Sequence, residues 1–506
     1  MYDVNLKHTL AEFENHMKAK GLFVESNLSD KADILVENIS FNSKEIVPGT
    51  LFICKGIHFR DVYLKDALSL GAFAYVSEIK YDIAGDVPYI IVSDIKEAMA
   101  YIADFFYNEV QSKLKIVGIT GTKGKTTTTY FIKHILDAYA ESVGSPVPGM
   151  FSSVRIYDGK TDEPSRRTTP EAFEVHRHFK NMYDSGIEWV VMEVSSQALK
   201  YHRSLGVEFE SACFTNMGED HISDIEHSDW DDYFYSKLKL FDQSKAAIVN
   251  LNSDHAERIY EEAKKRTDTV LTFGFMPEAD VYGYDLEPDG INMKFKVRTK
   301  DFDEQFVLNM RGVYNISNAL GAIAMAYSMD IPVSAMKKGL LNTDVEGRMK
   351  MFFVENKNVT VIVDFAHNGM SLQALCESTV HEFPGSPIHI VYGSPGDKAF
   401  GRRKELGSVA GKFAACSYIT EDDPGEESPV DISNEIAKHV EAEGGAYKII
   451  IDRHEAIKAA ILEAPENGVV LIIGKGAETD MKRGLIFEDC PSDSEHVLEV
   501  LANDIK

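Results

Sequence analysis

The chain has 506 residues, of which 53 are Lys or Arg and 80 are Asp or Glu, so its formal net charge is −27. This acidic balance disfavours nucleic acid and anionic membrane surfaces as partners. The N-terminus lacks the pattern of a signal peptide, and no apolar run approaches the roughly 20 residues that span a bilayer. We therefore expect a cytoplasmic protein of several domains, with its five scattered cysteines reduced.

The first block, residues 1–111, mixes short strands with helices. The segments "GTLFICKG" and "PYIIVSD" read as strands, whereas "VYLKDALSLGAFAYV" (62–76) reads as helical. A further helix is expected in "SDIKEAMAYIADFFYNE", with Ser93 or Asp94 as its N-cap.

Two α/β blocks follow, which we place at residues 112–344 and 345–506. In the first, "WVVMEV" (189–194) and "AAIVNL" (246–251) are β-branched runs that suit buried parallel strands. In the second, "VTVIVDFAH", "IHIVYG", "CSYITEDD", "YKIIID" and "GVVLIIGKG" are apolar strands with polar or glycine ends. This alternation predicts a doubly wound, Rossmann-like sheet, whose ligands bind at the carboxyl ends of the strands.

The stretch "KIVGITGTKGKTTTTYFIKHIL" (115–136) reads as a strand, a glycine-rich turn and a helix. Such a turn directs backbone N–H groups and the positive end of the helix dipole toward one point, which favours an anion. Gly121 and Gly124 let the backbone close in. Lys125 can then reach terminal phosphates, and the Thr126 hydroxyl can hold Mg²⁺. The common pattern G-x-x-x-x-G-K-[ST] is not met, because Ile119 stands where it requires glycine.

Three further residues are candidate ligands of a metal. Glu193 lies at a strand end in "VMEVSSQAL", where a carboxylate could complete a Mg²⁺ shell opposite Thr126. His221 follows in "FTNMGEDHISDIEH" and Lys237 in "YFYSKLKLF". Taken singly, each has an ordinary alternative: a capping carboxylate, a loop histidine and a solvated helix lysine.

The loop "TGTKGKTT" and the order of these segments resemble the Mur ligase family, which joins amino acids to peptidoglycan precursors. The resemblance implies an ATP site that includes the loop residues Gly121, Thr122, Lys123, Gly124, Lys125, Thr126 and Thr127. It implies that Thr126 and Glu193 bind one Mg²⁺, and that His221 and a carbamylated Lys237 help to hold a second metal site.

The same family resemblance extends to the rest of the nucleotide site. "GVYNISNALGA" resembles a segment whose asparagine, here Asn315, contacts adenine. "VEGRMK" resembles a segment whose arginine, here Arg348, faces the γ-phosphate, and "VDFAHNGMSL" carries Asp364 near the ribose. Catalytic roles are thereby implied for Lys125, His221, Lys237 and Arg348.

The N-terminal segment "SFNSKEIVPGTLFICKGIHFRDVYL" resembles the UDP-binding domain of the MurE group within this family. That group adds the third residue of the peptide stem to UDP-N-acetylmuramoyl-L-Ala-D-Glu. The implied substrate contacts are Ser43, Thr168, Thr169, Ser195, Tyr201, Arg203 and Lys237. The chain departs from the group at Lys44, where arginine is usual, and at Gln197, where most members have histidine.

The added amino acid is predicted from Asp422, Asp423, Pro424 and Gly425. Diaminopimelate-adding enzymes carry D-N-P-R there, and their arginine pairs with the extra carboxylate. An acidic pocket without that arginine suits the ammonium of L-lysine. Against this, Lys398 and either Arg402 or Arg403 could reach into the pocket, or they could bind the α-carboxylate of the amino acid. The resemblance also implies contacts from Gly474 and Glu478. The alternatives left open are meso-diaminopimelate or another diamino acid, and an acidic surface loop with no role in specificity.

Three other functions remain as rivals. A folylpolyglutamate synthetase is disfavoured because its chain begins close to the phosphate loop. A P-loop switch or motor would hydrolyse nucleotide without any amino acid. A non-catalytic paralogue is disfavoured by Lys125, Glu193, His221 and Lys237. We therefore expect a ligase that uses ATP and Mg²⁺, acts on a UDP-linked precursor and L-lysine, and is a monomer.

Overall fold

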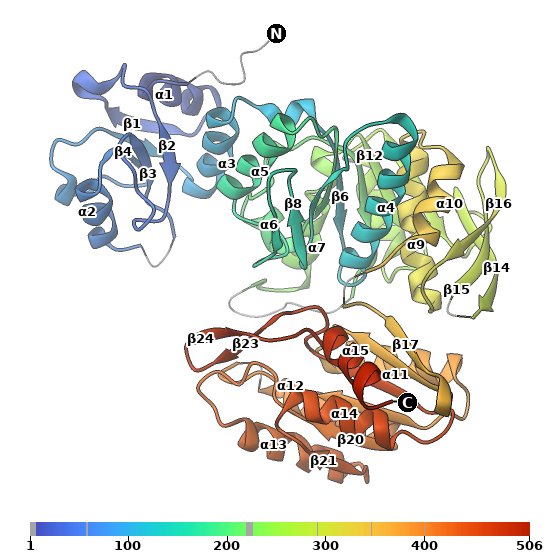
Figure 1. Cartoon of the computed structure of the whole chain (residues 1–506). Coiled ribbons are helices and arrows are strands. Elements are labelled where there is room, and N and C mark those ends of the chain that lie inside the picture. Colours follow the sequence, from blue (N-terminus) through green and yellow to red (C-terminus); the bar gives the residue numbers. More distant parts are fainter. Residues whose placement is uncertain are drawn as a thin grey trace. The chain divides into compact units, whose positions relative to one another are not determined.

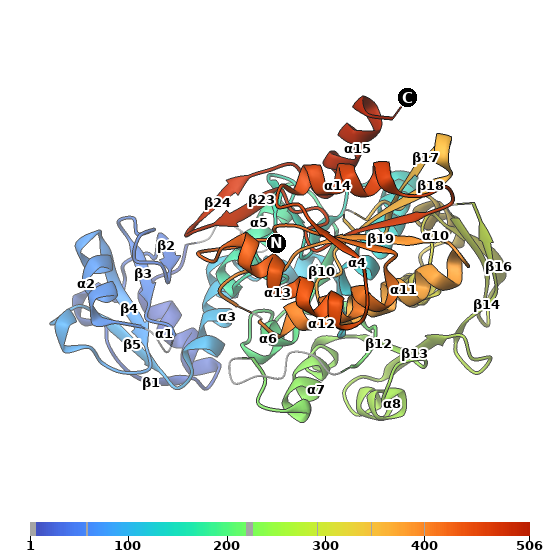
Figure 2. The same cartoon turned by 90° about the horizontal axis from the view of Figure 1, so that it is seen from below.

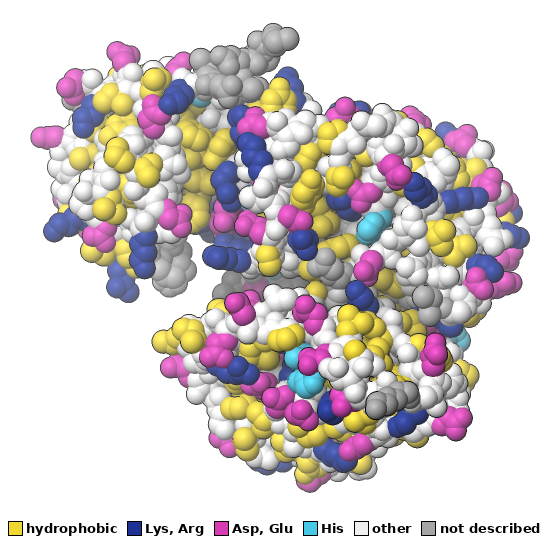
Figure 3. Space-filling view, in the orientation of Figure 1, with side chains coloured by type: hydrophobic (Ala, Val, Ile, Leu, Met, Phe, Trp, Pro, Cys, Tyr) yellow, Lys and Arg dark blue, Asp and Glu magenta, His cyan; other side chains and the backbone are white. Residues whose placement is uncertain are grey.

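The computed structural model describes residues 7–56, 59–218, 226–290, 292–345, 347–398 and 400–505 (Figure 1). The chain forms two compact units. The first comprises residues 1–285, 295–306 and 317–341, and the second comprises residues 286–294, 307–316 and 342–506. On the face shown in Figure 3, acidic and basic side chains are interspersed over both units.

The N-terminal part of the first unit is a five-stranded sheet of order β1-β5-β4-β3-β2, in which only β1 is antiparallel to its neighbour. Its strands are β1 (Phe23–Asn27), β2 (Asn38–Ser40), β3 (Thr50–Ile53), β4 (Ala72–Ser77) and β5 (Tyr89–Val92). Its helices are α1 (Leu10–Ala19), α2 (Asp61–Ser69) and α3 (Ile95–Phe106). The Asp94 side chain caps α3, as predicted. The prediction of one helix over 62–76 was wrong in its second half, because Gly71 at φ +113° separates α2 from β4.

The larger sheet has the order β16-β15-β14-β13-β12-β11-β6-β10-β7-β8-β9. Its central strands are parallel, and both predicted buried strands occur, as β10 (Trp189–Glu193) and β12 (Ala246–Asn250). The other strands are β6 (Lys115–Thr120), β7 (Gly149–Phe151), β8 (Arg155–Tyr157), β9 (Asp162–Pro164), β11 (Phe209–Phe214), β13 (Thr269–Gly274), β14 (Val281–Asp289), β15 (Asn292–Arg298) and β16 (Asp303–Leu308).

Seven helices accompany this sheet among the described residues: α4 (Lys125–Val143), α5 (Ala172–Asp184), α6 (Ser196–Lys200), α7 (Trp230–Leu238), α8 (Ala256–Lys264), α9 (Val313–Ser328) and α10 (Val333–Leu341). Helices α4 and α10 approach closely at Gly339, where a Cβ would lie 2.5 Å from the backbone of Ile135. Phe179, Val190, Phe209 and Phe234 are fully buried in one core that joins α5 and α7 to the sheet.

The second unit contains a six-stranded sheet of order β17-β18-β22-β19-β20-β21, parallel except for the edge strand β17. Its strands are β17 (Lys350–Val354), β18 (Val359–Asp364), β19 (Ile388–Tyr392), β20 (Cys416–Ile419), β21 (Tyr447–Ile449) and β22 (Val469–Ile473). Figure 2 shows α11 (Gly369–Glu382), α12 (Gly401–Phe413) and α13 (Pro429–Ala442) on one side and α14 (Arg453–Glu463) and α15 (Asp493–Asn503) on the other. A hairpin of β23 (Asp480–Arg483) and β24 (Ile486–Asp489) precedes α15. The predicted doubly wound α/β sheet is confirmed.

None of the helices in the described residues has both the length and the apolar character needed to cross a bilayer. All five cysteines are free, and Cys54, Cys213 and Cys376 are buried. The domain boundaries proposed after residues 111 and 344 stay a prediction.

Candidate active site

The loop between β6 and α4 has the backbone conformation that the glycine pattern predicts. Gly121 and Gly124 have φ values of +147° and +79°. A Cβ on Gly121 would lie 2.0 Å from Thr215 Oγ1, and one on Gly124 would lie 2.3 Å from Asn318 Oδ1. A side chain at either position is therefore excluded by both conformation and space. Because α4 begins at Lys125, its positive end faces the loop.

Asn216, which follows β11, holds this loop in place. Its carbonyl oxygen accepts the N–H of Thr122 at 2.9 Å, and its Oδ1 accepts the N–H of Lys123 at 2.8 Å. Lys125 Nζ donates to the carbonyls of Gly121 and Thr122, at 3.1 and 3.2 Å. The lysine predicted to bind phosphate therefore lies over its own loop. Sequence reasoning missed Asn216, because its partner loop is about ninety residues away along the chain.

A cluster of oxygen atoms lies where α4 begins and β10 ends. Thr126 Oγ1 is 3.2 Å from Glu193 Oε1 and 2.7 Å from Ser153 Oγ. Ser153 also donates its N–H and hydroxyl to Glu193 Oε2, at 3.0 and 3.1 Å. Hard oxygen donors of this kind are the ligands that Mg²⁺ takes. The residues present therefore fit the predicted Mg²⁺ site, with Ser153 as a neighbour that sequence reasoning missed.

Thr169 and Ser195 support the end of β10. Thr169 Oγ1 donates to the carbonyl of Glu193 at 3.0 Å and accepts the N–H of Ser195 at 3.0 Å. The Ser195 hydroxyl caps α6 by accepting the N–H of Ala198 at 3.2 Å. Two residues predicted for substrate binding thus lie next to the predicted metal ligand.

Lys237 lies in the last turn of α7 and is 1% exposed. Its Nζ donates to the carbonyl of Gly121 at 2.8 Å and lies 4.3 Å from the centre of the Tyr233 ring. The predicted partner His221 lies outside the described residues. Another histidine, His227, is fully buried here, with Nε2 3.0 Å from Ser196 Oγ. Burial lowers the pKa of His227, which favours its neutral form.

A cavity of 470 Å³ opens beside these residues. The described residues that line it are Lys125, Arg167, Thr168, Thr169, Ser195, Ser196, Gln197, Arg203, Glu226 and Lys237. Four of these side chains are basic and one is acidic, so the lining is cationic within a strongly acidic chain. Such a cavity favours an anionic ligand. Sequence reasoning missed Arg167, although it directly precedes the predicted substrate contact Thr168.

Glu171 gathers three cations at the edge of this cavity. It bonds Lys55 at 2.5 Å, Arg203 at 3.0 Å, and Arg167. Burial opposes the charged form of Glu171, but Arg203 and Lys55 outweigh it, so the pKa of this carboxyl is lowered. Lys55 follows β3, so this ion pair ties the five-stranded sheet to the larger one.

Ser43 and Tyr201 do not appear among the described residues that line the cavity. Ser43 lies in the turn after β2, and Lys55 follows the neighbouring parallel strand β3, so both lie at one edge of the sheet. The Tyr201 ring lies 3.9 Å below Lys96 Nζ. Their predicted contacts with the substrate stay predictions.

In the second unit, Asp364 organises the segment that carries Arg348. Its carboxylate accepts the N–H groups of Met349 and Ala366, at 2.9 and 2.8 Å. The Arg348 guanidinium lies 4.4 Å from the centre of the Phe365 ring. Burial raises the pKa of Asp364, and Arg348 opposes this rise. Asn315, also predicted for the nucleotide, donates to the carbonyl of Arg311 at 2.6 Å.

The residues predicted for the amino acid converge within this unit. Lys475 is buried, and its Nζ bonds Asp423 Oδ1 at 3.0 Å and Glu478 Oε2 at 2.9 Å. Gly474 has φ +109°, and a Cβ there would lie 2.5 Å from Asp422 Oδ2. Burial raises the pKa of Asp422, and the cations nearby oppose this rise. The cluster thus has three acids around the Lys475 ammonium, and the Arg453 guanidinium, which is paired with Asp493, also acts on Asp422.

Gly425 follows Pro424 in this loop, and both its backbone conformation and the space around it require glycine. It has φ +59°, a Cβ there would lie 2.1 Å from Asp397 Oδ2, and its N–H donates to the carbonyl of Lys482 at 3.1 Å. Arg483, which forms a β-bridge with Gly425, pairs with Glu421 at 2.5 Å.

Two other cations predicted to reach this pocket differ in their exposure to solvent and in their ion pairs. Lys398 is exposed in a turn. Arg403 is buried and bonded to Glu427 at 2.9 Å and Glu435 at 2.7 Å. The Arg403 guanidinium is therefore already paired within this unit, and its predicted contact with the amino acid stays a prediction.

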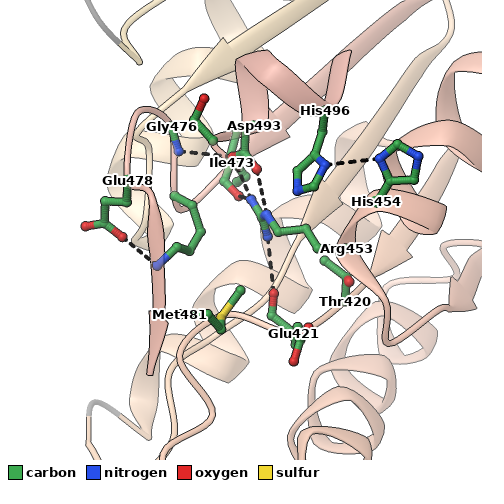
Figure 4. A network of polar contacts seen from close by, with 12 residues as sticks. Thr420, Glu421, Arg453, His454, Ile473, Gly476, Glu478, Met481, Asp493 and His496 are labelled. Carbon is green, nitrogen blue, oxygen red and sulfur yellow. Dashed lines mark hydrogen bonds and ion pairs between the residues drawn. The ribbon is translucent and has the colours of Figure 1, made fainter. Parts of the chain in front are cut away.

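A buried ion pair that sequence reasoning missed holds these strand ends (Figure 4). Arg453 donates to Asp493 at 2.6 and 2.8 Å. It also donates to the carbonyls of Ile473 and Glu421, at 2.9 and 3.3 Å. Asp493 accepts the N–H of Gly476 at 3.0 Å. The pair therefore connects the ends of β20 and β22 to helices α14 and α15.

The phosphate loop, the oxygen cluster and the cationic cavity define a P-loop enzyme for anionic substrates. Family models match two segments of the chain: the Mur ligase middle domain at residues 119–326, and the Mur ligase, glutamate ligase domain at residues 347–476. The chain belongs to the Mur ligase family, which confirms the predicted resemblance.

Individual proteins that the chain resembles belong to the same family. The chain is 36% identical over 453 residues to a UDP-N-acetylmuramoyl-L-alanyl-D-glutamate–L-lysine ligase of Enterococcus faecalis, covering 88% of each chain. It is 34% identical to a UDP-N-acetylmuramoyl-L-alanyl-D-glutamate–2,6-diaminopimelate ligase of Clostridium perfringens, covering 88% of this chain and 90% of that one.

Solved structures share the fold across the whole chain. A diaminopimelate ligase aligns with a TM-score of 0.67 at 21% identity, covering 99% of both chains. MurF from Acinetobacter baumannii aligns with a TM-score of 0.63 at 18% identity, covering 98% of both. The predicted Mur ligase architecture is thereby confirmed.

Proposed function

We propose that this chain is an ATP-dependent ligase that joins L-lysine to the γ-carboxylate of D-Glu in UDP-N-acetylmuramoyl-L-Ala-D-Glu, a peptidoglycan precursor. The observation that carries the proposal is the cationic cavity. Lys125 of the phosphate loop and Thr168, Thr169 and Ser195, all predicted for the muramoyl dipeptide, line the same space. A substrate carboxylate bound there lies beside the phosphate site.

The reaction has two steps. A γ-carboxylate oxygen of D-Glu attacks the γ-phosphorus of ATP, the bond to ADP breaks, and an acyl phosphate forms. The amine of the amino acid then attacks the acyl carbon, phosphate leaves, and the amine loses its proton. Carboxylate and ATP repel each other, so the cations Lys125, Arg167 and Arg203 around the cavity offset that repulsion. Arg348 is proposed as a further phosphate-binding residue.

Thr126 and Glu193, with Ser153 behind them, are proposed to hold Mg²⁺. A bound Mg²⁺ would neutralise phosphate charge and so lower the barrier to attack by an anion. Lys237 is proposed to be carbamylated and, with His221, to serve a second metal. A carbamate requires an uncharged amine, and Lys237 is shielded from solvent. We further propose that the enzyme is a cytoplasmic monomer.

The choice of L-lysine rests on the acidic cluster in the second unit. Asp422, Asp423 and Glu478 outnumber the Lys475 ammonium, and the nearby Arg453 is already paired with Asp493, so the cluster favours an ammonium over a carboxylate. Gly425 supports this choice, because arginine at its φ of +59° would be strained. The alternative substrate, meso-diaminopimelate or another diamino acid, is kept because relatives of both kinds resemble the chain almost equally.

The test is phosphate release by the purified chain with ATP, Mg²⁺ and UDP-N-acetylmuramoyl-L-Ala-D-Glu, one amino acid at a time, with the product identified by mass. Release and a tripeptide product with L-lysine, but little with meso-diaminopimelate, would support the proposal. Preference for diaminopimelate would keep the ligase and overturn its specificity. Release that is indifferent to every amino acid would overturn the ligase and favour a P-loop switch. Lys125→Met is the control and should abolish release throughout.

A further inference from the structure

Two histidines and a glutamate meet where α14 and α15 pack together. His454 lies at the start of α14, and its Nδ1 is 3.0 Å from His496 Nδ1 on α15 (Figure 4). Glu499, also on α15, places Oε2 3.9 Å from His454 Nδ1. All three ligand atoms lie within 4.8 Å of one another.

The backbone presents these groups on a rigid frame. His496 and Glu499 are three residues apart on α15, so their side chains lie on the same face of the helix. The two helices are fixed by buried apolar residues that form one core: Ala456, Ile457, Ala460, Val497 and Val500. Asp493, the first residue of α15, is bonded to Arg453, the neighbour of His454. Both helices are therefore held in place without help from the histidines.

The three groups suit a transition metal better than Mg²⁺. Imidazole nitrogen is a ligand for zinc, copper, nickel and iron, whereas Mg²⁺ takes oxygen. In a tetrahedral zinc site with Zn–N of about 2.0–2.1 Å, two nitrogens lie about 3.3 Å apart, close to the 3.0 Å between the two Nδ1 atoms here. Glu499 is 56% exposed, which leaves an ion a path from solvent.

We propose that His454, His496 and Glu499 bind one divalent transition-metal ion of the zinc class. The ion adds a further link between α15 and α14, beside the Arg453–Asp493 pair that already joins them. This site is separate from the oxygen cluster of Thr126 and Glu193 and does not depend on the proposed reaction. The competing explanation is a metal-free hydrogen bond between two neutral imidazoles.

Cobalt(II) is the probe, because nitrogen ligation in a low-coordinate site changes its visible absorption. The full chain, stripped with a chelator and held in excess MgCl₂ to saturate the oxygen cluster, is titrated with Co²⁺, and Zn²⁺ is used to displace it. We expect one saturable equivalent with nitrogen-type bands, and a higher thermal unfolding midpoint in Zn²⁺. His454→Ala and Glu499→Gln should each weaken binding by at least about tenfold, since even outer partners of metal ligands contribute about 10- to 100-fold.

His381→Ala is the matched control, because His381 is an exposed histidine of the same unit that lies outside the cluster. It should bind Co²⁺ as the unaltered chain does. Glu499→Gln guards against misfolding, because it changes only an exposed carboxylate. Two results would overturn the proposal. One is the absence of nitrogen-type cobalt bands in the unaltered chain. The other is full retention of those bands in both His454→Ala and Glu499→Gln, which would place the ion elsewhere.

Discussion

Replacing Asp493 by asparagine should destabilise the second unit far more than an ordinary surface change. Arg453 and Asp493 are 5% and 1% exposed, and two hydrogen bonds of 2.6 and 2.8 Å join them. Asparagine has almost the same shape but no charge. The variant therefore leaves the Arg453 guanidinium buried without its counter-ion, and it weakens the acceptor of the Gly476 N–H.

The expected loss follows from this burial. Removing one partner of a buried ion pair costs about 3–5 kcal/mol, because the remaining charge cannot return to water. The carbonyls of Ile473 and Glu421 still accept from Arg453, so we expect a value near the lower end of that range. A double variant, Arg453→Met with Asp493→Leu, should recover part of the loss, because it buries no charge.

Urea unfolding can assign the loss to one unit. Both tryptophans, Trp189 and Trp230, lie in the first unit, so tryptophan fluorescence reports the unfolding of that unit alone. Asp493→Asn should lower the urea midpoint seen by far-ultraviolet circular dichroism and speed hydrogen exchange in residues 469–476, with the fluorescence transition unchanged. A loss below about 1 kcal/mol, the size of an ordinary hydrogen bond, would refute the idea that this ion pair holds the strand ends.

Three further predictions concern the first unit. Thr126→Val should raise the Mg²⁺ concentration needed for half-maximal phosphate release by at least about tenfold. Thr126→Ser keeps the hydroxyl and should leave that concentration unchanged. The same Mg²⁺ requirement in both variants would show that Thr126 is not a metal ligand. Arg203→Met should raise KM for the UDP-linked dipeptide with little change in KM for ATP. The control is Arg258→Met, because Arg258 is an exposed arginine paired with Asp231. An equal rise of KM in the control would argue against a substrate contact by Arg203. Burial lowers the pKa of His16 from 6.5 to about 4, so the unfolded chain binds more protons between those values, and stability should fall as pH falls through that window. His16→Leu should flatten this pH dependence in thermal unfolding, and an unchanged slope would show that other groups cause it.

Much of the fold could be predicted from patterns of neighbouring residues in the sequence. The strand, glycine turn and helix around Lys125 could be predicted because each step depends on neighbouring residues: apolar β-branched residues, two glycines at positive φ, and a helix start. The five apolar segments of the second unit became strands for the same reason. The failure over 62–76 is also local, because a short apolar run suits either a helix or a buried strand, and only pairing of β4 with β3 and β5 decides it.

The family, the phosphate loop and the residue types that the chemistry needs could all be predicted from the sequence. Which distant groups meet depends on the tertiary structure, which brings Asn216 to the loop backbone, Lys55 to Glu171 and Arg453 to Asp493. It also decided that Arg403 is already paired with Glu427 and Glu435. The physical reason is that a backbone preference acts over a few residues, whereas an ion pair depends on which strand ends the sheet order brings side by side.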